Sequence, residues 1–391
     1  MMTAAVYICT DPGVPAFGAK GCSVHLQEVL RELLRRYRCV HLITTRPGGN
    51  PPADLAGVVV HALPRPAGAS VAAREVAQRA ADAAAALRLA GLCSDHHVGH
   101  RVGLVYQRYG LWSAETLETA RRLGVPSVLE VNAPLLEEQA THRELVDAAE
   151  AERRTRRLLA AADAPFAVAG PVARWASSMD PRWRSVPAIG NGVDVARFTP
   201  APVRETAESR TLTVAFSGTF KPWHGLELLV DATAAASVPL RLLLIGDGPE
   251  LGVTCARAAA AGVPVTATGQ VSPAEVPVWL HTADLAAAPY PAGEHYFSPL
   301  KVAEYLAAGL PTVASAIADV PALVADGTEA LLVPPGDVAG TAAALGRLGR
   351  DVALRRSLAA AGRRAAETRL SWTAVVDRSL ALLAVPAEDV A

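Results

Sequence analysis

The sequence predicts an α/β protein made of two domains, each a doubly wound parallel sheet of the Rossmann type. Apolar, strand-like runs alternate with segments of helical period along most of the chain. Two such series are joined by a loop rich in Gly, Pro and Asn at residues 189–205. A length of 391 residues suits two domains of ordinary size. We therefore expect domains at 1–187 and 188–370 that face each other across a cleft, and a C-terminal helix over 371–391 that returns to the first domain.

The first series begins with a strand, a glycine-rich loop and a helix. The loop contains Gly18 and Gly21, and the helix has Leu26, Leu30 and Leu33 at the spacing of one buried face. The six strands of this series are predicted at residues 4–9, 40–45, 57–63, 103–109, 126–132 and 164–170.

The second series repeats this alternation after the linker. Its strands are predicted at residues 211–218, 240–246, 263–269, 284–290, 311–315 and 330–336. Open α/β sheets bind ligands outside the carboxyl ends of their strands, so candidate site residues are sought in the loops that follow these runs.

Composition and charge exclude several classes of protein. The net charge is −1, so a broad basic footprint for nucleic acid is absent. No apolar run reaches the roughly 18–20 residues of a membrane span, and we expect no secretory signal. The five cysteines have no CxxC spacing, which indicates neither a disulfide framework nor a zinc site. We expect a cytoplasmic protein without a transmembrane segment, although peripheral contact with a membrane stays open.

The strongest local pattern is a predicted helix start near residue 298. Ser298 and Pro299 read as N-cap and first helical position. Lys301 then falls in the first turn, where a cation opposes the helix dipole unless an anion binds there. Glu304 lies one turn further on the same face and can accept hydrogen bonds from two vicinal hydroxyls, as a ribose presents. The alternative is a plain surface ion pair between Lys301 and Glu304.

A second pattern, FSGTFKPWHG, joins a strand to a helix at 216–225. Gly218 ends the strand, Pro222 holds Lys221 extended, and His224 stands before the helix. These side chains would contact a ligand at the carboxyl end of that strand. The alternative is an ordinary exposed lysine and a capping histidine, and Trp223 is expected to pack.

The third pattern, LLLIGDGPELG, places Gly246 in a tight turn that lets backbone approach a nucleotide. Its spacing is GxGxxxG, and no acidic residue ends the next strand, so it is weak evidence for NAD. Gln270 and Val271 follow that strand and would offer backbone contacts to a base. No DxD motif is present to hold a nucleotide-bound metal ion, so we expect no metal site.

In combination these segments resemble retaining glycosyltransferases of family 4, the glycosyl transferases group 1 with the GT-B fold. GTFKPWHG, LLLIGDGPE, TGQV, SPLKVAEYLAAGLPTVAS and GTEALLVPPGD stand in that family's order and spacing. The resemblance implies that Glu304 binds the donor ribose. The family's preceding glutamate would fall at Tyr296 and is either missing or shifted to Glu294. Lys221 and His224 stand where the family holds the diphosphate.

The resemblance also implies further site residues. It implies that Lys221, Glu294 and Asn132 are catalytic residues. Asn132 stands where many members of the family have a histidine. It implies that a larger set of loop and helix-start residues binds the donor. That set is Gly18, Gly21, Gly218, His224, Gly246, Gln270, Val271, Tyr296, Phe297, Ser298, Pro299, Leu300, Lys301 and Glu304.

The implied activity is transfer of a hexose from a UDP- or GDP-linked donor, with retention and without a metal or other cofactor. The acceptor would be a small molecule, lipid or saccharide with a hydroxyl, amine or thiol group. Composition fits a bacterial enzyme that makes a specialised metabolite, a glycolipid or a polysaccharide, and the sequence does not choose among them. The alternatives are a nucleotide-sugar epimerase of the same fold, an NAD-dependent oxidoreductase, and a non-catalytic module that binds sugar nucleotides.

Overall fold

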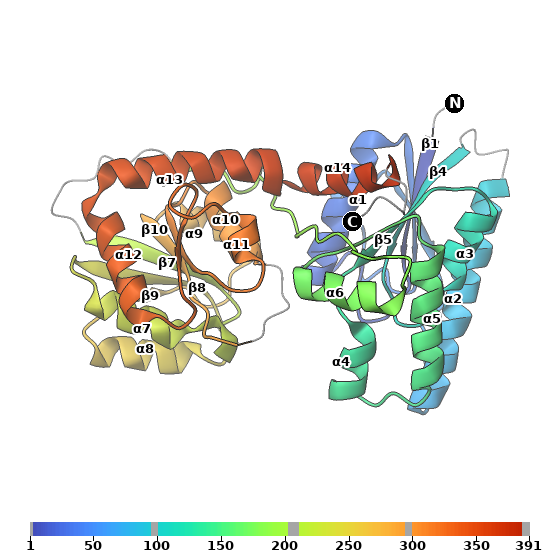
Figure 1. Cartoon of the computed structure of the whole chain (residues 1–391), viewed down its shortest axis with the longest axis horizontal. Coiled ribbons are helices and arrows are strands. Elements are labelled where there is room, and N and C mark those ends of the chain that lie inside the picture. Colours follow the sequence, from blue (N-terminus) through green and yellow to red (C-terminus); the bar gives the residue numbers. More distant parts are fainter. Residues whose placement is uncertain (1–2, 95–100, 202–210, 294–298, 385–391) are drawn as a thin grey trace. The chain divides into compact units, whose positions relative to one another are not determined.

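A computed structural model describes residues 3–94, 101–201, 211–293 and 299–384 of the chain (Figure 1). It divides into two compact units. Unit 1 comprises Met1–Gly190 and Val375–Ala391, and unit 2 comprises Asn191–Ala374. Each unit is built on a six-stranded parallel sheet flanked by helices, as the sequence predicts.

The sheet of unit 1 has the strand order β3-β2-β1-β4-β5-β6, so the chain reverses its winding direction between β1 and β4. The strands are buried because crossover helices cover both faces of a parallel sheet. The elements follow one another as β1 (Thr3–Cys9), α1 (Gly21–Arg36), β2 (Cys39–Thr44), β3 (Val58–Ala62), α2 (Val71–Ser94), β4 (Arg101–Arg108), α3 (Glu115–Arg122), β5 (Ser127–Val131), α4 (Leu135–His142), α5 (Ala148–Ala161), β6 (Ala164–Ala167) and α6 (Gly170–Met179).

Unit 2 has the order β12-β11-β10-β7-β8-β9, which is the same topology with its switch between β7 and β10. The elements are β7 (Leu212–Gly218), α7 (Leu226–Ala235), β8 (Leu240–Gly246), α8 (Leu251–Ala260), β9 (Val265–Ala267), α9 (Val276–Leu280), β10 (Leu285–Ala288), α10 (Leu300–Ala307), β11 (Thr312–Ser315), α11 (Val320–Leu323), β12 (Leu331–Val333), α12 (Val338–Arg350) and α13 (Val352–Ala365).

The last helix, α14 (Trp372–Ala381), begins in unit 2 and ends in unit 1. Its Asp377 carboxylate pairs with the Arg36 guanidinium at the end of α1, with the two atoms 2.6 Å apart. The predicted return of the C-terminal helix to the first domain is therefore confirmed.

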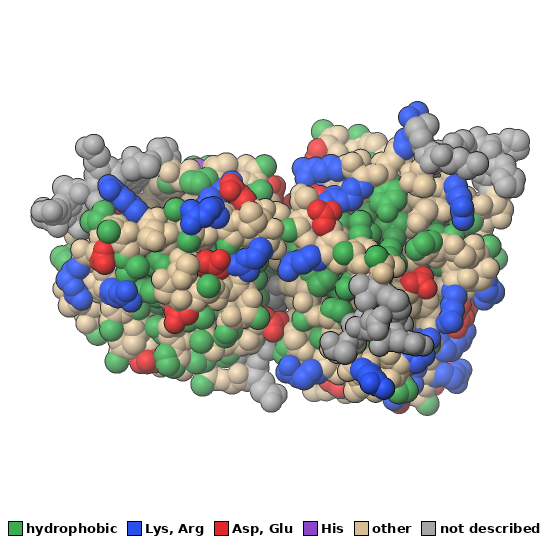
Figure 2. All heavy atoms as spheres, turned by 45° about the horizontal axis from the view of Figure 1, so that its top comes forward, with side chains coloured by type: hydrophobic (Ala, Val, Ile, Leu, Met, Phe, Trp, Pro, Cys, Tyr) green, Lys and Arg blue, Asp and Glu red, His purple; other side chains and the backbone are tan. Residues whose placement is uncertain are grey.

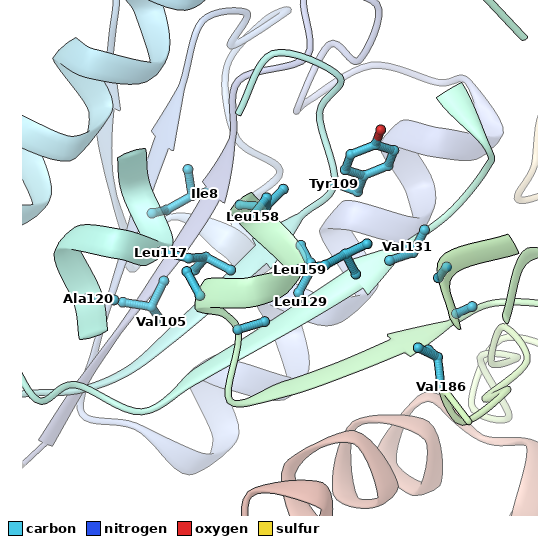
Figure 3. Close-up of a cluster of buried hydrophobic side chains, with 14 of the residues drawn as sticks. Ile8, Val105, Tyr109, Leu117, Ala120, Leu129, Val131, Leu158, Leu159 and Val186 are labelled. Atoms are coloured by element: carbon cyan, nitrogen blue, oxygen red, sulfur yellow. The ribbon is translucent and has the colours of Figure 1, made fainter. Parts of the chain in front are cut away.

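Apolar side chains from the two faces of each sheet form the cores. In unit 1, Ile8, Val105 and Leu129 come from three adjacent strands and meet Leu117 of α3 and Leu158 of α5 (Figure 3). All five are shielded from solvent. This packing fixes the strands, and hence the positions of the loops that follow their carboxyl ends.

The surface carries basic and acidic side chains interspersed among apolar ones on the face seen in Figure 2, in line with the net charge of −1. Within the described residues, no helix is both long and apolar enough to cross a bilayer. All five cysteines are free thiols.

Candidate functional site

The carboxyl ends of β7 and β8 in unit 2 meet through backbone. A Cβ atom placed on Gly246 would lie 2.0 Å from the carbonyl oxygen of Gly218, and one placed on Gly248 would lie 2.1 Å from that of Thr219. All three glycines have positive φ, at 154° for Gly218, 123° for Gly246 and 156° for Gly248. Glycine is required here because any side chain would separate the two loops.

The loop after β7 follows the predicted geometry. Lys221 is extended, with φ −91° and ψ 156°, before a single 3₁₀ turn at Pro222–His224. The backbone N–H of Lys221 donates to Nδ1 of His224 at 3.3 Å, which leaves the ring proton on Nε2 when the ring is neutral. Gly225, in the left-handed conformation, is then the N-cap of α7.

His224 is neutral at physiological pH. Its burial, followed by the positive charges of Lys301 and Lys221, lowers the pKa of the imidazole to about 4. The ring packs against Phe216, with the ring centroids 5.6 Å apart. His224 therefore offers this site an N–H hydrogen-bond donor rather than a positive charge.

Trp223 differs from expectation. Its side chain is 50% exposed and meets His224 only edge-on, so the prediction that it packs is wrong. The 3₁₀ turn that presents it is short and projects the indole away from the core.

Helix α10 begins at Leu300, and Pro299 is its N-cap, so the expectation that Pro299 is the first helical residue is wrong by one position. The φ of −79° and ψ of 62° at Pro299 are not helical. Glu294, Tyr296, Phe297 and Ser298 lie outside the described residues.

Lys301, in the first turn of α10, has an ammonium group that is shut off from solvent. Its Nζ finds no hydrogen-bond partner among the described residues. It lies over the ring of Phe216 at 4.1 Å from the centroid, and 5.4 Å from that of Tyr290. Burial lowers the pKa of this ammonium to about 7, and the nearby Glu304 opposes the shift.

Glu304 lies one turn further along α10 and is partly buried. Burial raises the pKa of its carboxyl group to about 7, against the effects of Arg197 and Lys301. The ion pairs formed among the described side chains do not include Lys301 with Glu304, and Nζ is buried. The alternative of a surface ion pair is therefore wrong.

The loop after β9 contacts the glycine loop at the end of β8. Thr268, after β9, accepts a hydrogen bond from the N–H of Gly246 at 3.1 Å, and Gly269 bridges to Gly246. Gln270 and Val271 follow directly, and Gln270 is exposed. Unit 2 thus gathers Gly218, Lys221, His224, Gly246 and Lys301 at the ends of adjacent strands.

Unit 1 holds a second polar cluster at the ends of β4 and β5. Arg108 and Glu130 stand opposite each other in the parallel register, and His25 of α1 forms an ion pair with the Glu130 carboxylate. Burial alone would raise the pKa of Glu130, but His25, Arg108 and the amide of Asn132 lower it below its usual range. Asn132, the predicted residue of this unit, is thus joined to a charged network.

The role of His25 was missed in the sequence. It lies four residues before Val29 on the apolar face of α1, where a histidine reads as an ordinary core residue. The glycine loop before this helix is described as well. Gly18 accepts a hydrogen bond from the Gln27 amide at 2.9 Å, and a Cβ on Gly21 would meet nothing within 4 Å.

Comparison with known proteins shows what this arrangement is similar to. Residues 211–351 match the sequence profile of the glycosyl transferases group 1. The match lies within unit 2, and the resemblance predicted from the motifs is confirmed.

The relatives with curated names are also glycosyltransferases. Over 219 residues the chain is 32% identical to the phosphatidyl-myo-inositol mannosyltransferase of Mycobacterium leprae, in a match that covers 54% of this chain and 56% of the relative. It is 31% identical over 236 residues to the D-inositol 3-phosphate glycosyltransferase of Geodermatophilus obscurus, covering 54% of this chain and 49% of the relative. The chain thus spans about half the length of the curated relatives it matches.

Solved structures confirm the GT-B fold over nearly the whole chain. HepE of Anabaena, in complex with UDP and glucose, superposes with a TM-score of 0.65 at 15% identity, over 98% of this chain and 99% of that one. The lipopolysaccharide outer core galactosyltransferase WaaB gives 0.66 at 14% identity, over 97% and 99%. None of these matches favours an epimerase or an NAD-dependent oxidoreductase.

Proposed function

We propose that the protein is a retaining glycosyltransferase that moves a hexose from a UDP- or GDP-linked donor to a small-molecule, lipid or saccharide acceptor. The acceptor would react through a hydroxyl, amine or thiol. The observation that carries the proposal is the buried ammonium of Lys301, which has no hydrogen-bond partner among the described residues and lies beside the backbone-packed glycine loops of unit 2. A buried cation of this kind is stabilised when an anion, here the donor diphosphate, enters the site.

The chemistry requires that negative charge on the departing diphosphate be stabilised. Lys301 and Lys221 would supply positive charge, and the Nε2–H of His224 would donate a hydrogen bond. Glu304 would accept hydrogen bonds from the ribose hydroxyls. Fixed cations would replace a divalent metal, so we propose that the reaction needs neither a metal nor another cofactor.

In unit 1, Asn132 would contact the reacting groups, held in place by Glu130, Arg108 and His25. The resemblance gives Gly18 and Gly21 a place near the donor, and Glu294 remains a candidate for gripping the donor sugar. The free cysteines fit a cytoplasmic enzyme, in keeping with the sequence prediction.

The proposal is tested in two stages. Thermal shift with UDP, GDP, ADP and dTDP identifies the base, because a ligand at 100 times its dissociation constant adds about 2.7 kcal/mol of apparent stability. The matching nucleotide sugars are then incubated with the protein and panels of polyol, lipid and amine acceptors, with and without EDTA.

Transfer to an acceptor, unaffected by EDTA and with retention at the anomeric carbon, is the expected result. Conversion of the donor sugar without any acceptor would identify an epimerase instead. Stabilisation by none of the nucleotides would overturn the proposal.

A further inference from the structure

Several buried polar atoms near the carboxyl ends of β1, β4 and β5 in unit 1 have no hydrogen-bond partner among the described residues. They are the hydroxyl of Tyr7, Nη1 of Arg108, Oε2 of Glu130 and Oδ1 of Asn132, and we call these four residues the unit 1 polar cluster. The chain reverses its winding between β1 and β4, and open α/β sheets bind ligands at such a point. Because buried polar atoms are rarely left unpaired, four of them at this point indicate a binding site.

Tyr7, Arg108 and Glu130 share one face of the sheet. The rings of Tyr7 and Tyr106 stack with their centroids 5.6 Å apart, and Arg108 follows Tyr106 by two positions in β4. Glu130 stands directly opposite Arg108 in the parallel register. Its Oε1 pairs with His25 of α1, which leaves Oε2 as the oxygen without a partner.

The unit 1 polar cluster is open to a ligand only at the edge of the sheet. Tyr7 is fully buried, and the side chain of Glu130 is 1% exposed. Arg108, at the end of β4, and Asn132, just after β5, are half-buried. A ligand at the carboxyl ends of these strands therefore meets Arg108 and Asn132 first, with Glu130 and Tyr7 beneath them.

The unpaired atoms differ in the hydrogen bonds that they can make. Nη1 of Arg108 only donates, the carboxylate oxygen of Glu130 only accepts, and the hydroxyl of Tyr7 does both. A phosphate or carboxylate would bind Arg108 but be repelled by Glu130, and an ammonium would bind Glu130 but be repelled by Arg108. A hydroxyl group both accepts and donates and carries no charge, so two adjacent hydroxyls satisfy both residues.

We propose that the unit 1 polar cluster binds the acceptor of the proposed transfer reaction, and that this acceptor is a polyol with adjacent hydroxyl groups, such as a saccharide or a cyclitol. One hydroxyl accepts a hydrogen bond from Arg108 and its neighbour donates one to Glu130. The inference rests on the proposed function and narrows it, because an amine, a thiol or a lipid with a single hydroxyl satisfies only part of the cluster.

The test measures binding to the full chain by saturation-transfer difference NMR, with ring compounds of one size as probes. The polyols are D-glucose, D-mannose, D-galactose and myo-inositol. The compounds with a single functional group are cyclohexanol, cyclohexylamine, cyclohexanethiol and cyclohexyl phosphate. We expect at least one polyol to bind about tenfold or more tightly than every single-group compound, because each added hydrogen bond to a charged group contributes about that factor. No donor is present, so the result does not depend on unit 2.

Two variants assign the contacts. Glu130→Gln and Arg108→Gln are each expected to weaken polyol binding about tenfold or more, towards the affinity for cyclohexanol, while nucleoside diphosphates stabilise them as they do wild type. Arg101→Gln, at an exposed position at the start of β4, is the matched control and should bind polyols as wild type does. Circular dichroism melts verify folding. Arg108→Gln carries the test if Glu130→Gln, which loses the pairing with His25, does not fold.

Equal affinity for polyols and single-group compounds, or a polyol preference that survives in the folded variants, would overturn this inference alone. Binding of no polyol would also overturn it and would assign the cluster to internal water. Stabilisation by none of the nucleotides would instead overturn the proposed function, while a polyol preference that both variants lose would still establish the binding site.

Discussion

Glu130 in unit 1 and Glu304 in unit 2 are both buried or partly buried glutamates near the carboxyl ends of parallel strands, yet they differ in their surroundings. Glu130 pairs with His25 and faces Arg108, and its pKa is lowered in spite of burial. Among the described residues Glu304 has no ion-pair partner, and burial raises its pKa to about 7. The two units share one topology, but charged partners lower the pKa of the glutamate in unit 1, whereas burial raises the pKa of the glutamate in unit 2.

The difference between the two glutamates indicates where a ligand would bind in each unit. Compensation within the protein, as at Glu130, rigidifies a site before any ligand arrives. The ammonium of Lys301 has no hydrogen-bond partner among the described residues, and a buried charge of this kind is costly until an anion binds, which favours a functional role over a stabilising one. Four ways to break or sharpen this comparison follow from the structure.

The largest effect is expected from the glycine loops of unit 2. Gly246→Ala should lower the free energy of unfolding by about 4 kcal/mol, because a Cβ would press on the Gly218 oxygen at 2.0 Å and φ is 123°. Gly21→Ala in unit 1, where the added Cβ meets nothing within 4 Å, is the matched control and should change stability by less than about 0.5 kcal/mol. Urea unfolding measures both, and equal effects would contradict the backbone packing of unit 2.

The second-largest effect on stability is expected from the His25–Glu130 pair of unit 1. His25→Ala should cost about 3 kcal/mol, since it leaves the Glu130 carboxylate buried beside one partner fewer. His142→Ala, on the exposed side of α4, is the control and should be nearly neutral. A melting temperature for His25→Ala equal to that of wild type would show that Glu130 does not need this partner.

A smaller effect of opposite sign is expected at Lys301. Lys301→Met should leave the melting temperature of the ligand-free protein unchanged or raise it by a few degrees, because a buried polar group with no partner among the described residues is replaced by an apolar side chain of similar length. Arg347→Met, at an exposed position of α12, controls for loss of a surface charge. A clear fall in the melting temperature of Lys301→Met alone would mean that the ammonium has a stabilising role within unit 2.

The last effect concerns pH. The raised pKa of Glu304 contributes stability at low pH that is lost as pH rises from about 4.5 to about 7. The lowered pKa of Lys301 makes the folded state bind fewer protons, so stability is regained as pH rises from about 7 to about 10.5. Wild type minus the double variant Lys301→Met/Glu304→Gln should therefore show a minimum near pH 7 in thermal melts. A flat difference profile would contradict the shifted pKa values of Lys301 and Glu304.

The sequence predicted the architecture well because periodicity reports which faces are buried. Each expected strand is present, as at 240–246, where the predicted run and β8 (Leu240–Gly246) coincide. The extended backbone of Lys221 before Pro222 was also predictable, since proline restricts the residue before it.

The environment of the site was not predictable in the same way. Whether Lys301 is a surface cation or a buried one depends on Phe216 and Tyr290, which are distant in sequence and meet it only after the sheet forms. The neutral state of His224 and the His25–Glu130 pair likewise depend on tertiary burial. The roles of Lys221, Asn132 and Glu294 in the reaction stay predictions.

The most direct test of the central claim, that the buried Lys301 of unit 2 binds a nucleotide diphosphate, is the dissociation constant of the preferred nucleoside diphosphate. We predict that at about pH 7.5 Lys301→Met weakens this affinity by about 10- to 100-fold, as expected for a lost charge-assisted contact of about 1.5–3 kcal/mol, while Arg347→Met binds as wild type does. Equal affinity of Lys301→Met and wild type, measured by calorimetry on folded protein, would contradict the account.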